Sequence, residues 1–175
     1  VAPGPYLGDA GDLALPNTSL ASMREALAAQ AAPLLARHHM VWLGGDHSIT
    51  LPLLRAYKEH FGQPLAVLHF DAHCDTWGPF KGSKFHHGAP FRLAVEDGLL
   101  DPRRTIQIGI RGGQNTTDTW DWSEQAGMRV VYIEEFEDLG VEGVIAEARR
   151  VVGDGPTYIT FDVDGLDPVY APGTG

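Results

Sequence analysis

Leu65-Ala-Val-Leu-His-Phe70 is an apolar run that leads directly into Asp71-Ala72-His73-Cys74-Asp75. A short, continuous apolar run of this kind predicts a strand that is buried on both faces of a sheet. In an extended chain, Asp71, His73 and Asp75 would point to one side and the two intervening residues to the other. Polar groups at the end of a buried strand are costly without partners. The stretch therefore predicts a buried strand with metal-ligating side chains at its carboxyl end.

Two further apolar runs end in the same kind of residues. Residues 40–43 lead into Gly44-Gly-Asp-His-Ser48, and residues 157–161 lead into Asp162-Val-Asp-Gly-Leu-Asp-Pro168. Either group alone fits a turn or a helix cap. Together, the three groups offer two imidazoles and at least four carboxylates, which are enough to hold two divalent ions.

Predicted strands and helices alternate along the chain. In order, they are a helix from Asn17-Thr-Ser19 toward Arg37 with a kink or break at Pro33, strand 40–43, a helix capped by Ser48 and ending near Gly62, strand 65–70, helix 90–100, strand 104–110, helix 117–126, strand 129–133, helix 141–152 and strand 157–161. This order predicts an α/β fold, a three-layer αβα arrangement with a mainly parallel sheet. Ligand sites in such folds lie at the carboxyl ends of the strands, where all three polar groups would meet.

Composition favours one soluble domain. The chain has 175 residues, is 43% hydrophobic and carries a formal net charge of −10. This charge argues against general affinity for nucleic acid or anionic membranes, and it would favour the approach of cationic ligands. No run reaches the roughly 18 apolar residues that span a bilayer, and residues 1–4 lack the features of a signal peptide. With a single cysteine, Cys74, the sequence predicts a cytoplasmic protein without an internal disulfide.

The three polar groups also carry a family resemblance. Gly44-Gly-Asp-His-Ser48, Asp71-Ala-His-Cys-Asp75 and Phe161-Asp-Val-Asp-Gly-Leu-Asp-Pro168 resemble, in order, the signature motifs of the ureohydrolases, the arginase and agmatinase superfamily. Residues 87–92 and 104–111 resemble the agmatinase branch. The resemblance implies that residues 1–175 form the central portion of a single ureohydrolase-like domain. Its expected flanking parts, including a later acidic residue that grips the guanidinium group, have no counterpart in these residues.

The resemblance implies a binuclear manganese site. One ion would be surrounded by His47, Asp71, Asp75 and Asp162, and the other by Asp71, His73, Asp162 and Asp164, so that Asp71 and Asp162 would bridge. A carboxylate-dominated set suits Mn²⁺ better than thiol-selecting metals, although zinc, cobalt or nickel could also bind. The implied chemistry is attack of a metal-bridging hydroxide on a guanidinium carbon, with release of urea and an amine.

A histidine outside the ligand set is expected to protonate the departing amine, because its pKa lies near neutrality. The resemblance assigns this role to His87, and His86 is a competitor that the residues alone do not separate. Asp75 would hold the hydroxide by a hydrogen bond in addition to binding metal. Cys74 is expected to pack in the core. His69 is expected to be a hydrogen-bonded group behind the ligands, and Asp46 and Asp167 fit turn-forming roles.

The implied substrate is a small cationic guanidino compound, with agmatine first and guanidinobutyrate or guanidinopropionate next. Arginases resemble one another in placing an Asn two residues beyond the position of Asp75, where it helps to hold the α-amino acid end of arginine. Trp77 stands there instead. The resemblance further implies a homo-oligomer, a trimer or a hexamer. The alternatives are a metal-binding but catalytically incompetent homologue with a structural or regulatory role, and a binuclear phosphoesterase, which would not explain the resemblance of the intervening segments.

Overall fold

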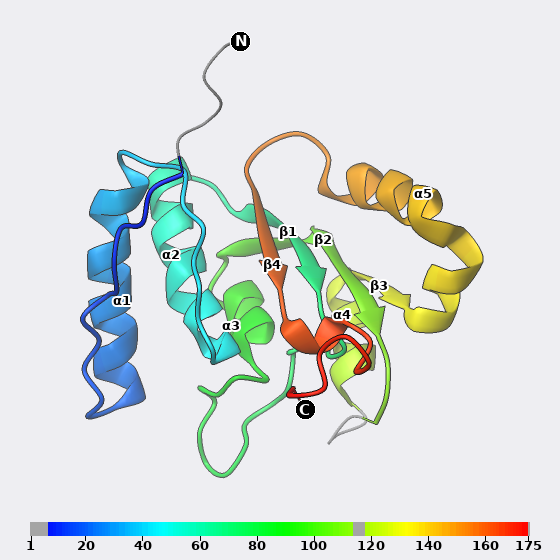
Figure 1. Ribbon diagram of the computed structural model, residues 1–175, viewed down its shortest axis with the longest axis horizontal. Coiled ribbons are helices and arrows are strands. Elements are labelled where there is room, and N and C mark those ends of the chain that lie inside the picture. Colours follow the sequence, from blue (N-terminus) through cyan, green and yellow to red (C-terminus); the bar gives the residue numbers. More distant parts are fainter. Residues whose placement is uncertain (1–6, 114–117, 175) are drawn as a thin grey trace.

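The computed structural model describes residues 7–113 and 118–174, which form a four-stranded parallel sheet flanked by helices (Figure 1). The strands are β1 (Leu65–Phe70), β2 (Leu100–Ile110), β3 (Arg129–Tyr132) and β4 (Thr157–Phe161). Their order across the sheet is β3-β2-β1-β4. All three pairings are parallel, so the carboxyl ends of the strands lie along one edge. The predicted α/β fold is confirmed.

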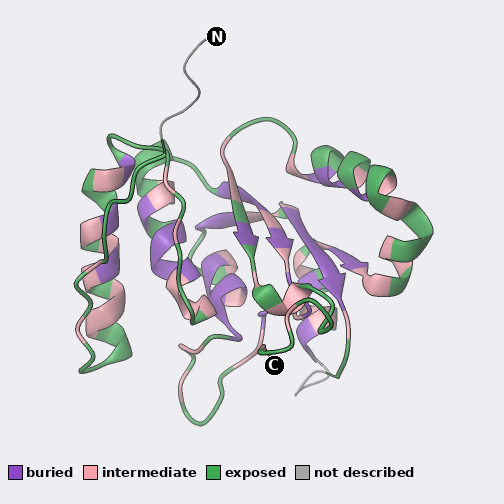
Figure 2. Cartoon of the chain, viewed as in Figure 1, coloured by how far each residue is buried: buried purple, intermediate pink, exposed green. Residues whose placement is uncertain are grey.

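Helices cover both faces of this sheet, and most side chains of the inner strands are buried (Figure 2). The helices are α1 (Leu20–Leu35), α2 (Thr50–Phe61), α3 (Pro90–Glu96), α4 (Asp118–Ala126) and α5 (Ile133–Val152), with short 3₁₀ helices η1 (His47–Ile49) and η2 (Val163–Gly165). On one face, Leu54 of α2 and Phe91 of α3 pack into a common core with β1. On the other, Val144 and Val151 of α5 pack against β2 and β3. No helix in the described ranges is long and apolar enough to cross a membrane.

Several helix boundaries follow from local sequence signals. Ser19 is the N-cap of α1, as predicted, and Gly62 ends α2 in the left-handed conformation at φ 69°. Pro33 lies inside α1 and does not end it. The predicted cap at Ser48 is wrong, because Asp46 accepts the Ser48 N–H at 2.9 Å and starts η1, which runs into α2. Asp46 thus has the turn-forming role expected of it.

Residues 40–43, predicted as a strand, form none. Met40 and Trp42 pack against the core beneath α1 and α2, whereas Val41 and Leu43 are 71% and 94% exposed. The alternating burial of an extended chain is present, but a strand also needs a neighbour for its backbone groups. Within the described residues β4 is an edge strand that does not pair with this segment. An apolar pattern alone could not reveal the missing partner.

Other elements differ from the prediction at their boundaries. The predicted helix 90–100 ends at Glu96 as α3, and β2 begins at Leu100 instead of Arg104. The predicted helix 141–152 is the second half of α5, which begins at Ile133 and is interrupted at Gly140, where φ is 65°. Strand 129–133 ends one residue earlier, and the first residue of predicted helix 117–126 lies outside the described residues.

Candidate metal centre

Three segments of the chain meet beyond the carboxyl ends of β1 and β4. Phe70 and Phe161 are paired at the ends of these neighbouring strands, and the N–H of Asp162 donates to the Phe70 carbonyl at 2.9 Å. The residues that follow the two strands therefore start side by side. Figure 1 shows η2 at this edge of the sheet, directly after β4. Contacts of His47 bring η1 to the same place.

Three carboxylates surround the Nδ1 atom of His47. This atom lies 3.2 Å from Asp71 Oδ2, 3.0 Å from Asp75 Oδ2 and 3.3 Å from Asp162 Oδ2. It is buried and has no hydrogen-bond partner among the described residues. The Nε2 atom on the other side of the ring lies 2.9 Å from the Thr160 hydroxyl. A buried nitrogen without a hydrogen bond, facing three carboxylate oxygens, fits the ligand set of a divalent cation.

A second group adjoins the first and shares Asp71 with it. His73 Nδ1 lies 3.0 Å from Asp164 Oδ2 and 3.5 Å from Asp71 Oδ1. The ligand atoms of Asp71, His73 and Asp164 all lie within 4.8 Å of one another. One oxygen of Asp71 thus faces His47 and the other faces His73, as a bridging carboxylate requires. Asp162 contributes Oδ2 to the first group, and its Oδ1 accepts the N–H of Asp164 at 3.2 Å.

The carboxylates of the cluster give it an excess of negative charge. Burial would lower the pKa of His47, but the carboxylates of Asp162, Asp71 and Asp75 outweigh burial and raise this pKa to about 12. Burial also raises the pKa of Asp75. Around His73, the Asp164 and Asp71 carboxylates raise the imidazole pKa to about 10. Carboxylates outnumber imidazoles in both groups, so divalent cations would offset the excess negative charge.

Asp71 and Asp75 converge by a route that strand alternation did not predict. Strand β1 ends at Phe70, and Asp75 has the left-handed backbone value φ 50°. Asp tolerates this region better than most residues. The predicted extended geometry over 71–75 is therefore wrong, although the two carboxylates do meet at His47. Cys74 is buried among Ile110 and Val130, as expected for a packing residue, and burial raises its thiol pKa to about 12.

His86 and His87 lie in the loop before α3, and both rings are close to Trp77, with centroids 5.9 and 6.1 Å from the indole. His86 donates through Nε2 to the Gly78 carbonyl at 3.0 Å, whereas His87 is exposed. In the described part of the chain, the ion pairs of the acidic cluster include neither histidine.

Arg111 is a residue of this edge to which sequence reasoning gave no role. Its guanidinium group donates to the backbone carbonyls of Asp164 at 2.6 Å, Gly165 at 3.2 Å and Leu166 at 2.7 Å, and also to Gly109 within its own strand region at 3.1 Å. Arg111 therefore fixes η2, the turn that carries Asp164, to the end of β2. The available signal was a charged residue directly after an apolar strand.

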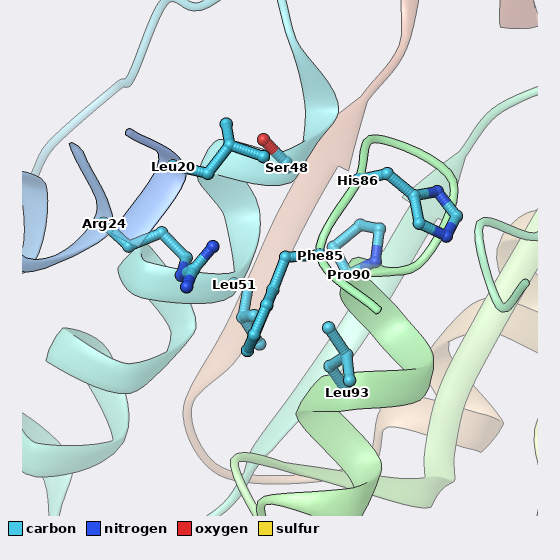
Figure 3. A pocket seen from close by; sticks show the side chains of 8 residues that line it. All are labelled: Leu20, Arg24, Ser48, Leu51, Phe85, His86, Pro90 and Leu93. Atoms are coloured by element: carbon cyan, nitrogen blue, oxygen red, sulfur yellow. The ribbon is translucent and has the colours of Figure 1, made fainter. Parts of the chain in front are cut away.

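A small pocket is lined by residues that do not belong to the acidic cluster (Figure 3). The guanidinium carbon of Arg24 is 3.7 Å from the ring centroid of Phe85 within it. None of the lining residues belongs to the candidate metal ligands, so this pocket adds nothing to the metal centre. The lining residues are Leu20, Arg24, Ser48, Leu51, Phe85, His86, Pro90 and Leu93.

The chain belongs to the arginase family, whose family model matches residues 6–175. It is 55% identical over 134 residues to a guanidinopropionase from Pseudomonas aeruginosa, a match that covers 76% of this chain and 42% of the relative. It is 45% identical over 168 residues to an agmatinase from Escherichia coli, covering 95% of this chain and 51% of the relative. The solved proclavaminate amidino hydrolase from Streptomyces clavuligerus superposes with a TM-score of 0.89 at 42% identity, covering 95% of this chain and 56% of that one.

The chain thus spans about half the length of the curated relatives it matches. The description of residues 1–175 as the central portion of one domain stays a prediction.

Proposed function

We propose that this protein is a manganese-dependent hydrolase that cleaves a linear guanidino compound into urea and an amine. The observation that carries the proposal is the pair of adjoining ligand groups that share Asp71, one around His47 and the other around His73. The relatives are named guanidinopropionase, agmatinase and proclavaminate amidino hydrolase, which supports a guanidino substrate. Homo-oligomeric assembly as a trimer or hexamer is a further proposal from the family resemblance, and a cytoplasmic location is a further proposal from the composition of the chain.

The protein's own groups would hold two Mn²⁺ ions. The proposed ligands are His47, Asp71, Asp75 and Asp162 for one ion, and Asp71, His73, Asp162 and Asp164 for the other. Oxygen-rich sets with one imidazole suit Mn²⁺. When bound, the pair would lower the pKa of a shared water toward neutrality and so supply the nucleophile. Asp75, with its carboxylate beside His47, would also accept a hydrogen bond from this nucleophile.

His87 is the proposed proton carrier to the leaving amine. It lies outside the ligand groups and is exposed, so its ring can exchange protons with solvent. His86 is less suited, because its Nε2–H is already donated to the Gly78 carbonyl. The Trp77 ring borders both histidines and would orient the loop that presents His87.

The environment of Trp77 disfavours arginine as the substrate. A Cβ atom at Gly88 would lie 2.8 Å from the Trp77 ring, so the indole is closely covered by the loop. Its Nε1 is buried and has no hydrogen-bond partner in the described residues. Because an indole N–H can only donate, position 77 offers no acceptor for the α-amino group of arginine, and each buried unpaired polar group costs about 1–3 kcal/mol. We rank agmatine first, with guanidinopropionate and guanidinobutyrate close behind.

Urea release by the Mn²⁺-loaded, full-length gene product tests this function. Agmatine, guanidinopropionate, guanidinobutyrate and arginine would be compared by kcat/KM, and we expect arginine to be the poorest. Asp71→Asn should abolish urea release, whereas Asp138→Asn, at an exposed position of α5, should leave it unchanged. Arginine as the best substrate would refute the argument from Trp77. A protein that binds Mn²⁺ but releases no urea from any of the four compounds would instead be the catalytically incompetent homologue.

A further inference from the structure

Three buried polar side chains lie side by side across the sheet, one layer below the candidate ligands. His69 of β1 is paired in register with Gln107 of β2 on one side and with Thr160 of β4 on the other. Residues paired in this way project from the same face of a sheet. Their exposed fractions are 0%, 0% and 8%. We call Gln107, His69 and Thr160 the polar row.

At the Gln107 end of the polar row, the partners of both ring nitrogens assign one tautomer to His69. Gln107 Nε2 lies 2.6 Å from the Cys74 carbonyl, which can only accept, so this atom must be the amide NH₂ group. The same NH₂ group lies 3.1 Å from His69 Nδ1, which must then be the accepting nitrogen of the ring. The ring proton is left on Nε2, which donates to Asp71 Oδ2 at 2.8 Å.

Gln107 makes this arrangement at a cost. Its Oε1 is buried without a hydrogen-bond partner among the described residues. An unpaired buried acceptor is unfavourable for folding. An apolar side chain would avoid that cost but would take the donor away from the Cys74 carbonyl and from His69 Nδ1. Its NH₂ group and the accepting carboxylate of Asp71 assign the same tautomer to His69 and hold the ring from both nitrogens.

The Thr160 end of the row acts on His47 in the same way. The Thr160 hydroxyl lies 2.9 Å from His47 Nε2, 113 residues earlier in the chain. When His47 presents the lone pair of Nδ1 to a cation, Nε2 carries the proton, and the Thr160 oxygen accepts it. One end of the row thus acts on Asp71 through His69, at the same Oδ2 atom that faces His47, and the other end holds His47 by the ring nitrogen opposite Nδ1.

We propose that Gln107, His69 and Thr160 are positioning residues that orient Asp71 and His47 for metal binding by fixing the direction of their hydrogen bonds. The inference rests on the proposed metal site. It goes beyond that site in assigning roles to three residues outside the proposed ligand set. Partners of metal ligands contribute in this way because they fix the orientation of each ligand before the ion arrives.

Mn²⁺ affinity is the first test, measured on the full-length protein from the electron paramagnetic resonance signal of free Mn²⁺. Thr160→Val and His69→Phe remove one hydrogen-bonding group each, and the Phe ring keeps an aromatic neighbour for Phe91, whose centroid is 4.2 Å from that of His69. Both variants should bind Mn²⁺ about 10- to 100-fold more weakly. Thr105→Val is the matched control, because Thr105 is a buried threonine of β2 that bonds to the Asp101 carbonyl away from the ligands. It should change the affinity by less than about twofold.

The tautomer of His69 is the second test, and it needs neither activity nor metal. Nitrogen-15 spectra of the metal-free wild-type protein, assigned with His69→Phe, should show the proton on Nε2. In Gln107→Met the proton should stay on Nε2, because the Asp71 carboxylate can only accept, and the Nδ1 resonance should shift because the hydrogen bond from the NH₂ group is lost.

A wild-type ring with its proton on Nδ1 would overturn the proposal. So would Mn²⁺ affinities of Thr160→Val and His69→Phe equal to that of wild type. A wild-type protein that bound no Mn²⁺ would overturn the proposed metal site as well, which separates the two failures.

Discussion

Asp71 is the residue on which both ligand groups depend. Its carboxylate is almost fully buried, and it receives hydrogen bonds from His69 Nε2 at 2.8 Å and from the His73 N–H at 2.7 Å. One oxygen faces His47 and the other faces His73. Burial would raise the pKa of Asp71, but the surrounding histidines His69, His47 and His73 hold it well below its ordinary value. The ionised carboxylate can therefore serve both candidate ligand groups, as the proposed pair of cations requires.

Metal stoichiometry distinguishes a shared ligand from an unshared one. We predict about two Mn²⁺ per chain in the wild-type protein after saturation and dialysis. Asp71→Asn should lose both ions, because each group loses a charged ligand. His73→Asn should lose chiefly one ion, because its ring contacts only the second group. Elemental analysis gives these counts, with Asp138→Asn as the control. No more than one ion in the saturated wild-type protein would refute the paired site.

Replacement of His87 separates proton transfer from metal binding. His87→Asn should keep the wild-type metal content and lower kcat by about 100-fold or more, because general acid catalysis contributes on that scale. Added imidazole should restore part of the rate. The measurements are urea release and elemental analysis on the same preparation. Full activity in His87→Asn together with its loss in His86→Asn would move the proton carrier to the neighbouring residue.

At the scale of elements, the sequence predicts best where a boundary depends on local chemistry. The predicted strands 65–70 and 157–161 coincide with β1 and β4. Each apolar run stops at an Asp, which lies at the edge of the sheet, where its carboxylate can contact other polar groups. Segment 40–43 has an equally apolar pattern but lacks a ladder partner in the described residues. Likewise, the left-handed turn at Asp75 depends on its tertiary surroundings, so the sequence predicted which residues meet but not the path that brings them together.

The turn that carries two of the candidate ligands has its own support in Arg111. Lys has a single ammonium group and cannot reproduce the fork that reaches the three successive carbonyls of residues 164–166. Arg111→Lys should therefore speed hydrogen exchange in residues 162–168 and weaken Mn²⁺ binding about tenfold. Arg104→Lys is the control, because Arg104 also donates to backbone carbonyls, those of Val152 and Asp154 before β4. Equal effects of the two substitutions on Mn²⁺ binding would contradict a specific role for Arg111.

At the scale of the whole molecule, the metal centre joins segments that are distant in the chain. His47 precedes β1, Asp71 follows it, and Asp162 follows β4 after α5 has crossed the other face of the sheet (Figure 1). Their side chains lie close together, because the carboxylates of Asp71 and Asp162 are 3.2 and 3.3 Å from His47 Nδ1. Carboxylates outnumber imidazoles among the candidate ligands, so an excess of negative charge is left there without cations. Bound cations would offset this excess and connect the segments through shared ligands.

Stability should therefore depend on Mn²⁺ concentration. A ligand that binds only the folded state stabilises it by about 2.7 kcal/mol per site when its concentration is 100 times its Kd. We expect the midpoint of thermal unfolding of the full-length protein to rise by several degrees with saturating Mn²⁺ and to fall on chelation with EDTA. In Asp71→Asn the midpoint should not respond to Mn²⁺, because both ligand groups are incomplete. Asp138→Asn should respond as the wild type does, which separates a bound cation from a general effect of salt. A wild-type midpoint that stayed constant from EDTA to saturating Mn²⁺ would show that the cluster does not hold a cation in the folded state.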